Sequence, residues 1–250
     1  MDYKYLICTY KATDCLKIQI EIFKRLGSLD KLVIYENSPA SFTDNRTFLK
    51  SNGIAYIDNP GGKHAQTVDR ALKELDCRYV VLLDEDCFLR YDIESSLEIV
   101  KTFGIRLVGE ISASRGGYNL KPRVSPWCCI IDREWVEKKG IDFVNIEKVY
   151  NSGSSRFYLD DKNEMSNYGV KYDVGATFFE DIAEHHGMIS SWSDIFINKD
   201  KLYFHVEGAS WRPESDICKL MNQNPEATRL FFEKNQVQNI ENLKGQLGIV

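Results

Sequence analysis

The sequence has few of the features that mark membrane, secreted or nucleic-acid-binding chains. No apolar run approaches the roughly 18 residues that a membrane-spanning helix requires. The first ten residues, MDYKYLICTY, lack the basic start and the long apolar run of a secretion signal. The formal net charge of -5 gives no global attraction to phosphate backbones. We therefore expect a cytoplasmic protein without a transmembrane segment, whose charge does not indicate a nucleic-acid partner.

The cysteines form no recognisable disulfide or zinc pattern. The count is seven, an odd number, and no C-x-x-C pair occurs. Cys8, Cys77, Cys87, Cys128 and Cys129 all lie in apolar stretches. This distribution favours reduced thiols in a core, with zinc binding or a catalytic thiol as the weaker alternatives.

Both common glycine-rich phosphate motifs are also missing. The chain contains neither G-x-x-x-x-G-K-[ST] nor G-x-G-x-x-G. It does contain NPGGKHAQ, in which Gly61 and Gly62 precede a predicted helix that starts at Lys63. Exposed backbone amides, the positive helix end, Lys63 and His64 could meet an anion there. The alternative is an ordinary glycine turn before a helix.

Apolar strands alternate with amphipathic helices over the first 110 residues. Strands are predicted at 4–9, 31–38, 54–58 and 79–83, and helices at 12–27, 43–53, 63–75 and 92–104. Asp14 is the expected cap of the first helix, and Gly27 its expected end. This alternation predicts an α/β fold with a mostly parallel sheet flanked by helices, and ligands beyond the carboxyl ends of the strands.

The second half has a looser, mixed α+β pattern. It contains a predicted strand at 106–112, a glycine-rich loop at 114–126, a strand at 127–132 and a polar stretch at 145–170. A helix is predicted with Asp173 as its cap and Gly187 as its end, followed by a strand at 201–208. We therefore predict one domain over 1–212, in which the pattern changes at about residue 110. Residues 213–250 are predicted to form a helical extension.

The predicted strand YVVLL runs directly into three acids. If the extended conformation persists, the carboxylates of Asp84 and Asp86 emerge on one side and that of Glu85 on the other. Two carboxylates that face one cavity repel each other, and Mg²⁺ or Mn²⁺ would relieve this repulsion and neutralise a bound diphosphate. The alternative is that the acids cap a solvated turn. His205 alternates with apolar neighbours in LYFHVEG, which places it off the apolar face.

Together these residues resemble the inverting family 2 glycosyltransferases of the GT-A fold. The resemblance is clearest over residues 4–110 and weaker to about 212. It implies that 1–212 is a catalytic domain, with a nucleotide-sugar-binding half at 1–110 and an acceptor half at 111–212. LLDEDC is similar to the D-x-D motif of that family and is the most specific match. By resemblance Asp84 contacts the ribose or a metal-bound water, Asp86 ligates the metal, and His205 supplies a further metal ligand. We also expect Glu85 to be one of the donor-binding residues.

The same resemblance implies the remaining site residues. Thr9, Tyr10, Glu36 and Asn37 would form the nucleoside pocket, although Glu36-Asn37 departs from the aspartate-rich ending usual in the family. Lys63 and His64 would contact the donor, although the Arg-Asn pair of the family is absent there. Asp173 would be the general base, with Glu180 or Asp181 as substitutes. Independently of the resemblance, Arg212 and Lys63 could hold the diphosphate as fixed positive charges. An ordinary surface ion pair is the alternative for Arg212.

The implied activity is a metal-dependent transfer of sugar from a nucleoside diphosphate to a hydroxyl acceptor, with inversion and with Asp173 as the base. We expect Mn²⁺ or Mg²⁺ as cofactor, a UDP-sugar as donor and a saccharide as acceptor. Lipid-linked glycans, protein and nucleic-acid bases stay open as acceptors. The alternatives are a non-catalytic nucleotide-sugar-binding protein and a D-x-D phosphohydrolase, which would carry its motif on the first strand. The C-terminal helices are candidates for a peripheral membrane contact or for a homo-oligomer interface.

Overall fold

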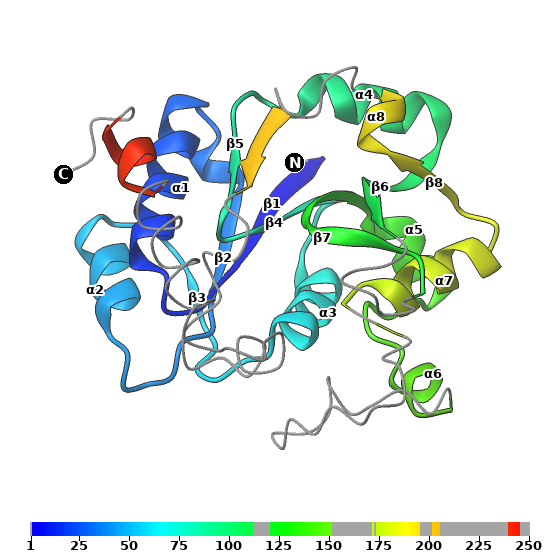
Figure 1. The fold of residues 1–250 in the computed structure, drawn as a ribbon, viewed down its shortest axis with the longest axis horizontal. Helices are drawn as coiled ribbons and strands as arrows, with labels where there is room; N and C mark the ends of the chain where they lie inside the picture. Colours follow the sequence, from blue (N-terminus) through cyan, green and yellow to red (C-terminus); the bar gives the residue numbers. More distant parts are fainter. Residues whose placement is uncertain are drawn as a thin grey trace, which may run out of the picture.

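The computed structural model describes residues 2–112, 121–151, 172, 174–195, 202–205 and 240–245 (Figure 1). The first half contains β1 (Tyr3–Thr9), α1 (Thr13–Arg25), β2 (Leu32–Glu36), α2 (Asp44–Ser51), β3 (Ile57–Asp58), α3 (His64–Glu74), β4 (Tyr79–Asp84), β5 (Cys87–Leu89) and α4 (Glu94–Phe103). The second half contains β6 (Ile105–Ser112), β7 (Arg123–Asp132), α5 (Arg133–Lys139), α6 (Ile146–Asn151), α7 (Ala176–Glu184), β8 (Met188–Ser191), α8 (Trp192–Ile195) and β9 (Tyr203–His205).

The main sheet has seven strands in the order β3-β2-β1-β4-β7-β6-β8. Strands β3, β2, β1 and β4 are parallel, and β7 is antiparallel to both of its neighbours, β4 and β6. The predicted α/β class with a mostly parallel sheet is therefore confirmed. The chain leaves β1 toward β2 and β3 and returns to β4 on the other side of β1. The strand order thus reverses at β1, which is where open α/β sheets bind their ligands.

The alternation of side chains along the central strands builds one core on each face of the sheet. Tyr5 and Ile7 of β1 lie in a core with α1 and α4, whereas Leu6 and Cys8 lie in a core with α3, α5 and α7. Both faces are covered, so the central strands consist almost entirely of apolar residues. Figure 1 shows α2 on the outer side of α1.

The cysteine prediction is confirmed for all five residues that it named. They are buried free thiols, as is the described Cys15. Burial raises the pKa of the Cys8 thiol, so the group stays protonated and inert. No helix of the described part could span a bilayer.

Residues 240–245 are helical and pack against the first half of the chain. Ile240 is buried in the same core as α1, and Lys244 Nζ lies 3.0 Å from Asp14 Oδ1. The end of the predicted helical extension therefore rests on α1 (Figure 1). The division of the chain at residues 110 and 212 stays a prediction.

Several boundaries differ from the prediction. The strand expected at 54–58 is reduced to the two residues of β3. The expected loop at 114–126 is wrong for Arg123–Pro126, which belong to β7, and α5 was not anticipated. Helix α7 begins at Ala176 with Gly175 at its N-cap, so Asp173 is not its cap. The N-cap of α1 is Ala12 and Asp14 lies in the first turn, so Asp14 is not the cap of this helix.

Candidate functional site

A cavity of about 440 Å³ lies at the carboxyl ends of β1, β2 and β4, beside the start of α3. Six of the predicted donor-binding residues line it: Tyr10, Asn37, Lys63, His64, Asp84 and Glu85. Four further residues, Cys8, Pro39, Gly61 and Gly62, complete its described wall. Residues from four separate segments therefore meet at the point where the strand order reverses.

The three acids after β4 have three different environments. The extended conformation ends at Asp84, and Glu85 and Asp86 form a turn before β5. Glu85 is buried, and its Oε2 accepts a hydrogen bond from the backbone N–H of Tyr10 at 2.7 Å. Its carboxylate therefore ties the loop after β1 to the acidic turn. Alternation along the sequence places Glu85 on the side opposite to Asp84 and does not reveal this contact.

Asp84 and His64 face each other across the cavity wall. His64 Nε2 lies 3.6 Å from Asp84 Oδ1, and both atoms are buried without a hydrogen-bond partner. Burial raises the pKa of Asp84 above its usual range, and His64 opposes this rise while the neighbouring Asp86 adds to it. An unpaired buried carboxylate oxygen beside an imidazole marks a place where a ligand group or cation would be stabilised.

Asp86 is paired with His205 because β5 and β9 form a two-stranded antiparallel sheet. Cys87 is opposite His205 in this ladder, which brings His205 Nε2 to 3.3 Å from Asp86 Oδ1. Trp127 of β7 stacks on the imidazole, with ring centroids 5.0 Å apart and an interplanar angle of 18°. The predicted metal ligands Asp86 and His205 are thus neighbours, and Trp127 fixes the plane of one of them.

A divalent cation at this site would have to be shared with a ligand. Asp84 lines the cavity, whereas Asp86 and His205 are not among its described lining residues. Within the described ranges no cluster of three or more His, Cys, Asp or Glu side chains could hold a metal by itself. Mg²⁺ is usually bound by one or two carboxylates, several waters and substrate phosphates rather than by a complete protein cage. Asp84 and Asp86, with His205 beside them, offer such an incomplete set, and Asp84 Oδ1 lacks a hydrogen-bond partner.

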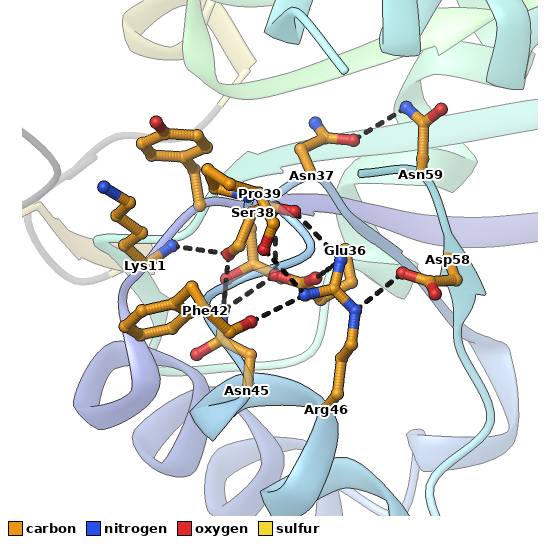
Figure 2. Close-up of polar contacts among 12 residues, drawn as sticks. Lys11, Glu36, Asn37, Ser38, Pro39, Phe42, Asn45, Arg46, Asp58 and Asn59 are labelled. Carbon is orange, nitrogen blue, oxygen red and sulfur yellow. Dashed lines mark hydrogen bonds and ion pairs between the residues drawn. The ribbon is translucent and has the colours of Figure 1, made fainter. Parts of the chain in front are cut away.

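Below the cavity, a buried ion pair holds the end of β2 (Figure 2). Glu36 is fully buried, and its Oε2 lies 2.7 Å from Arg46 Nη2 of α2. Arg46 also pairs with Asp58 and donates to the backbone carbonyls of Ser38, Pro39 and Phe42. Arg46 therefore fixes the loop that carries the cavity residues Asn37 and Pro39.

Two predicted nucleoside contacts belong to this supporting network. Thr9 is fully buried, and its hydroxyl accepts a hydrogen bond from Asn45 Nδ2, which also donates to Glu36 Oε1. Neither Thr9 nor Glu36 is among the cavity-lining residues. Their polar atoms hold the ends of β1 and β2 in place beneath the cavity. Glu36 at this position is explained by Arg46, which sequence reasoning missed.

The side chain of Asn37 has a fixed orientation at the cavity wall. Its Oδ1 accepts from Asn59 Nδ2 at 2.8 Å, and Figure 2 shows its amide nitrogen pointing away from Asn59. Gly62 packs against this pair, and a Cβ at that position would lie 2.0 Å from Asn59 Nδ2. The pair therefore explains why residue 62 has no side chain.

The glycine turn differs from the expected anion nest. The N–H of Gly61 donates to the carbonyl of Asn37, and the N–H of Gly62 donates to that of Asn59. Both amides are used within the turn, so the expectation that they face an anion is wrong. The N-terminus of α3, with Lys63 and His64, is what the segment presents to the cavity.

Four predicted candidates remain, namely Asp173, Arg212, Glu180 and Asp181. Asp173 and Arg212 fall outside the described residues. Glu180 is held by Lys121 and by the Tyr172 hydroxyl, and Asp181 pairs with Lys148 at 2.6 Å. Neither of these two acids lines the cavity, so their ion pairs stabilise the packing around α7.

Comparison with known proteins gives a likeness of fold. No protein-family model matches the chain, and no curated protein matches it in sequence. S. aureus TarS is 13% identical, with a TM-score of 0.43 over 58% of this chain and 30% of that one. The mannosyltransferase PcManGT from Pyrobaculum calidifontis, solved with GDP-Man and Mn²⁺, is 18% identical, with a TM-score of 0.41 over 57% of this chain and 47% of that one.

Glucosyl-3-phosphoglycerate synthase from Mycobacterium tuberculosis, solved with Mn²⁺, UDP and glucosyl-3-phosphoglycerate, is 16% identical, with a TM-score of 0.40 over 54% of this chain and 58% of that one. The chain thus spans between 30% and 58% of the length of these three structures. Identities and TM-scores this low describe a partial likeness of fold and assign no activity to this chain.

Proposed function

We propose that this chain is a metal-dependent glycosyltransferase that moves a sugar from a nucleoside diphosphate to a hydroxyl acceptor, with inversion. The observation that supports it is the cavity at the reversal of strand order, where a helix N-terminus with Lys63 and His64 lies beside Asp84. A diphosphate needs positive groups and a cation near its oxygens. This cavity offers Lys63 and a helix N-terminus, together with the Asp84 carboxylate, which could hold a cation. A saccharide is the proposed acceptor.

The residues have distinct proposed roles. Tyr10 and Asn37 would contact the nucleoside, and Lys63 and His64 the diphosphate. Asp84, Asp86 and His205 would hold Mg²⁺ or Mn²⁺, which when bound neutralises charge that develops on the departing diphosphate. These assignments need the carboxylates of Asp84 and Asp86 to be ionised.

Two roles fall on residues outside the described part of the chain, and they rest on the resemblance for Asp173 and on charge for Arg212. Asp173 would take the proton of the acceptor hydroxyl as that oxygen attacks the anomeric carbon, and the bond from that carbon to the diphosphate breaks. Arg212 would contact the diphosphate as a fixed positive charge. Asp173→Asn should retain donor binding and lose transfer, measured as release of the nucleoside diphosphate in the presence of acceptor. Transfer at the wild-type rate would exclude Asp173 as the base.

Thermal unfolding with a panel of nucleotides tests the donor site. UDP, GDP, CMP and dTDP are each added with Mn²⁺, Mg²⁺ or EDTA to the wild type and to Asp86→Ala. A ligand at 100 times its dissociation constant stabilises by about 2.7 kcal/mol, which raises the midpoint of a chain this long by roughly 5–11 °C. We expect this shift with UDP and metal only, and its loss in Asp86→Ala.

The exposed Asp76 provides the matched control. Asp76→Ala removes an acid from the same half of the chain and should leave the shift unchanged. A metal-dependent shift that survives in Asp86→Ala would contradict the metal role, and no shift with any nucleotide would overturn the proposed function. Nucleotide binding without transfer to any of a broad panel of acceptors would instead indicate a non-catalytic binding protein.

A further inference from the structure

Gln19 is a buried polar residue on the apolar face of α1. It is fully buried, next to the buried Ile18 and Ile20. Its Nε2 lies 2.6 Å from the carbonyl oxygen of Cys87, 3.4 Å from that of Asp84 and 3.5 Å from that of Glu85. One side-chain amide therefore gathers three carbonyls of the acidic turn around a single point.

Packing does not explain a glutamine here. Gln19 Oε1 is buried without a hydrogen-bond partner, which costs free energy relative to an apolar side chain of similar size. The buried side chains beside it in α1, Ile18 and Ile22, are aliphatic and belong to the core on this face of the sheet. A leucine would suit the apolar neighbours and would remove the unpaired Oε1, but it would also remove the donor to the three turn carbonyls. What a leucine lacks is the pair of N–H donors.

The amide of Gln19 acts on the geometry of the acids. Because the carbonyls of residues 84, 85 and 87 converge on α1, the intervening peptide planes have a fixed direction. The side chain of Asp84 then faces His64 and the cavity, and that of Asp86 faces His205. The bond from the Tyr10 N–H to Glu85 restrains the same turn from the loop after β1.

We propose that Gln19 is a positioning residue for the metal and nucleotide site, acting through the acidic turn. Its amide sets the relative placement of the Asp84 and Asp86 carboxylates, which must share a cation with a bound diphosphate. The inference rests on the proposed function, because it assigns Gln19 to the metal-dependent part of donor binding. It adds a residue from α1 that neither lines the cavity nor contacts the ligand.

The test compares Gln19→Leu with the wild type and with Ile22→Ala, which damages the same helix and core without touching the turn. Mn²⁺ is titrated into each protein with excess UDP, and free Mn²⁺ is followed by electron paramagnetic resonance. Thermal unfolding is measured in parallel. We expect Gln19→Leu to bind Mn²⁺ with UDP about 10–100-fold more weakly, the usual effect of losing a residue that orients ligands. Its melting temperature should stay close to that of the wild type.

Ile22→Ala should show the opposite pattern, with a lower melting temperature and unchanged Mn²⁺ affinity. Unchanged affinity in Gln19→Leu would overturn the role of Gln19 while leaving the proposed function intact. If Gln19→Leu does not fold, Gln19→Met, with its flexible apolar chain, is measured in the same way. Failure of both to fold would overturn the proposal in favour of a purely structural role. A wild type that binds no Mn²⁺ with UDP would overturn the proposed function itself, and the role of Gln19 with it.

Discussion

Replacing Arg46 by methionine should destabilise the fold far more than the loss of an ordinary surface ion pair. The Arg46 side chain is only 11% exposed and that of Glu36 is fully buried, and Arg46 Nη2 lies 2.7 Å from Glu36 Oε2. Methionine has a similar length but no charge and no donors. Arg46→Met would therefore leave a buried carboxylate without its cation, and three loop carbonyls without one of their donors.

The expected magnitude follows from the burial of the pair. Removing one partner of a buried ion pair costs about 3–5 kcal/mol, because the remaining charge stays desolvated. For a chain of this length each kcal/mol lowers the melting temperature by roughly 2–4 °C, so the midpoint should fall by about 6–20 °C. The pair holds Asn37 and Pro39 at the cavity, so nucleotide affinity should fall as well.

Urea unfolding, with the slope compared between variants, measures the change in free energy. Arg25→Met is the control, because Arg25 pairs with Glu21 four residues earlier on an exposed face of α1 and should cost at most about 0.5 kcal/mol. In the double variant Glu36→Gln with Arg46→Met, the loss should be smaller than the sum of the two single losses. A loss in Arg46→Met no larger than that in Arg25→Met would refute the reasoning.

Three further predictions concern the site and its surroundings. Gly62→Ala should weaken nucleotide binding about tenfold or more, about 1.4 kcal/mol, because the new Cβ would displace the Asn59 side chain from Asn37. Gly245→Ala, at a residue without a left-handed φ whose added Cβ would meet no atom within 4 Å, should leave the titrated affinity unchanged. Trp127→Leu should lower Mn²⁺ affinity about 10–100-fold, because the imidazole of His205 would lose the ring that stacks on it. Trp135→Leu, which alters the core on the opposite face of the sheet, should leave Mn²⁺ affinity unchanged. Lys148→Met should lower the free energy of unfolding in urea by about 1–3 kcal/mol, because it removes the cation beside the buried Asp181. Lys101→Met is the control, because the acidic partners of Lys101 are exposed. Equal losses in the two variants would contradict this prediction.

The central sheet was predictable because its strands are buried on both faces. An apolar run such as YVVLL suits only a strand covered by helices, and β1 and β4 confirm it. The boundaries were less predictable where tertiary contacts decide them. IAYID is apolar up to its final aspartate, but only Ile57 and Asp58 pair with β2. Arg123–Pro126 contains proline, yet it extends β7 against β6.

The cavity wall could be predicted from strand ends, and its support could not. Tyr10, Asn37 and Asp84 follow or end parallel strands, so their meeting at one edge is a consequence of the topology. Arg46 and Gln19 carry no such signal, because their partners lie 10 and more than 60 residues away in the chain. The hint that the sequence offers is a polar residue among apolar neighbours of a predicted helix, as Gln19 is between Ile18 and Ile20.

The acidic turn shows why spacing alone does not define the site. Alternation along a strand would place Asp84 and Asp86 on one side, but the strand ends at Asp84 and a turn carries the other two acids. Their directions are set instead by groups from outside the motif: the amide of Gln19, the N–H of Tyr10 and the imidazole of His205. Each comes from a different segment, so the same three acids on another support would point elsewhere. The chemistry proposed for this site therefore depends on α1 and β9 as much as on the acids themselves.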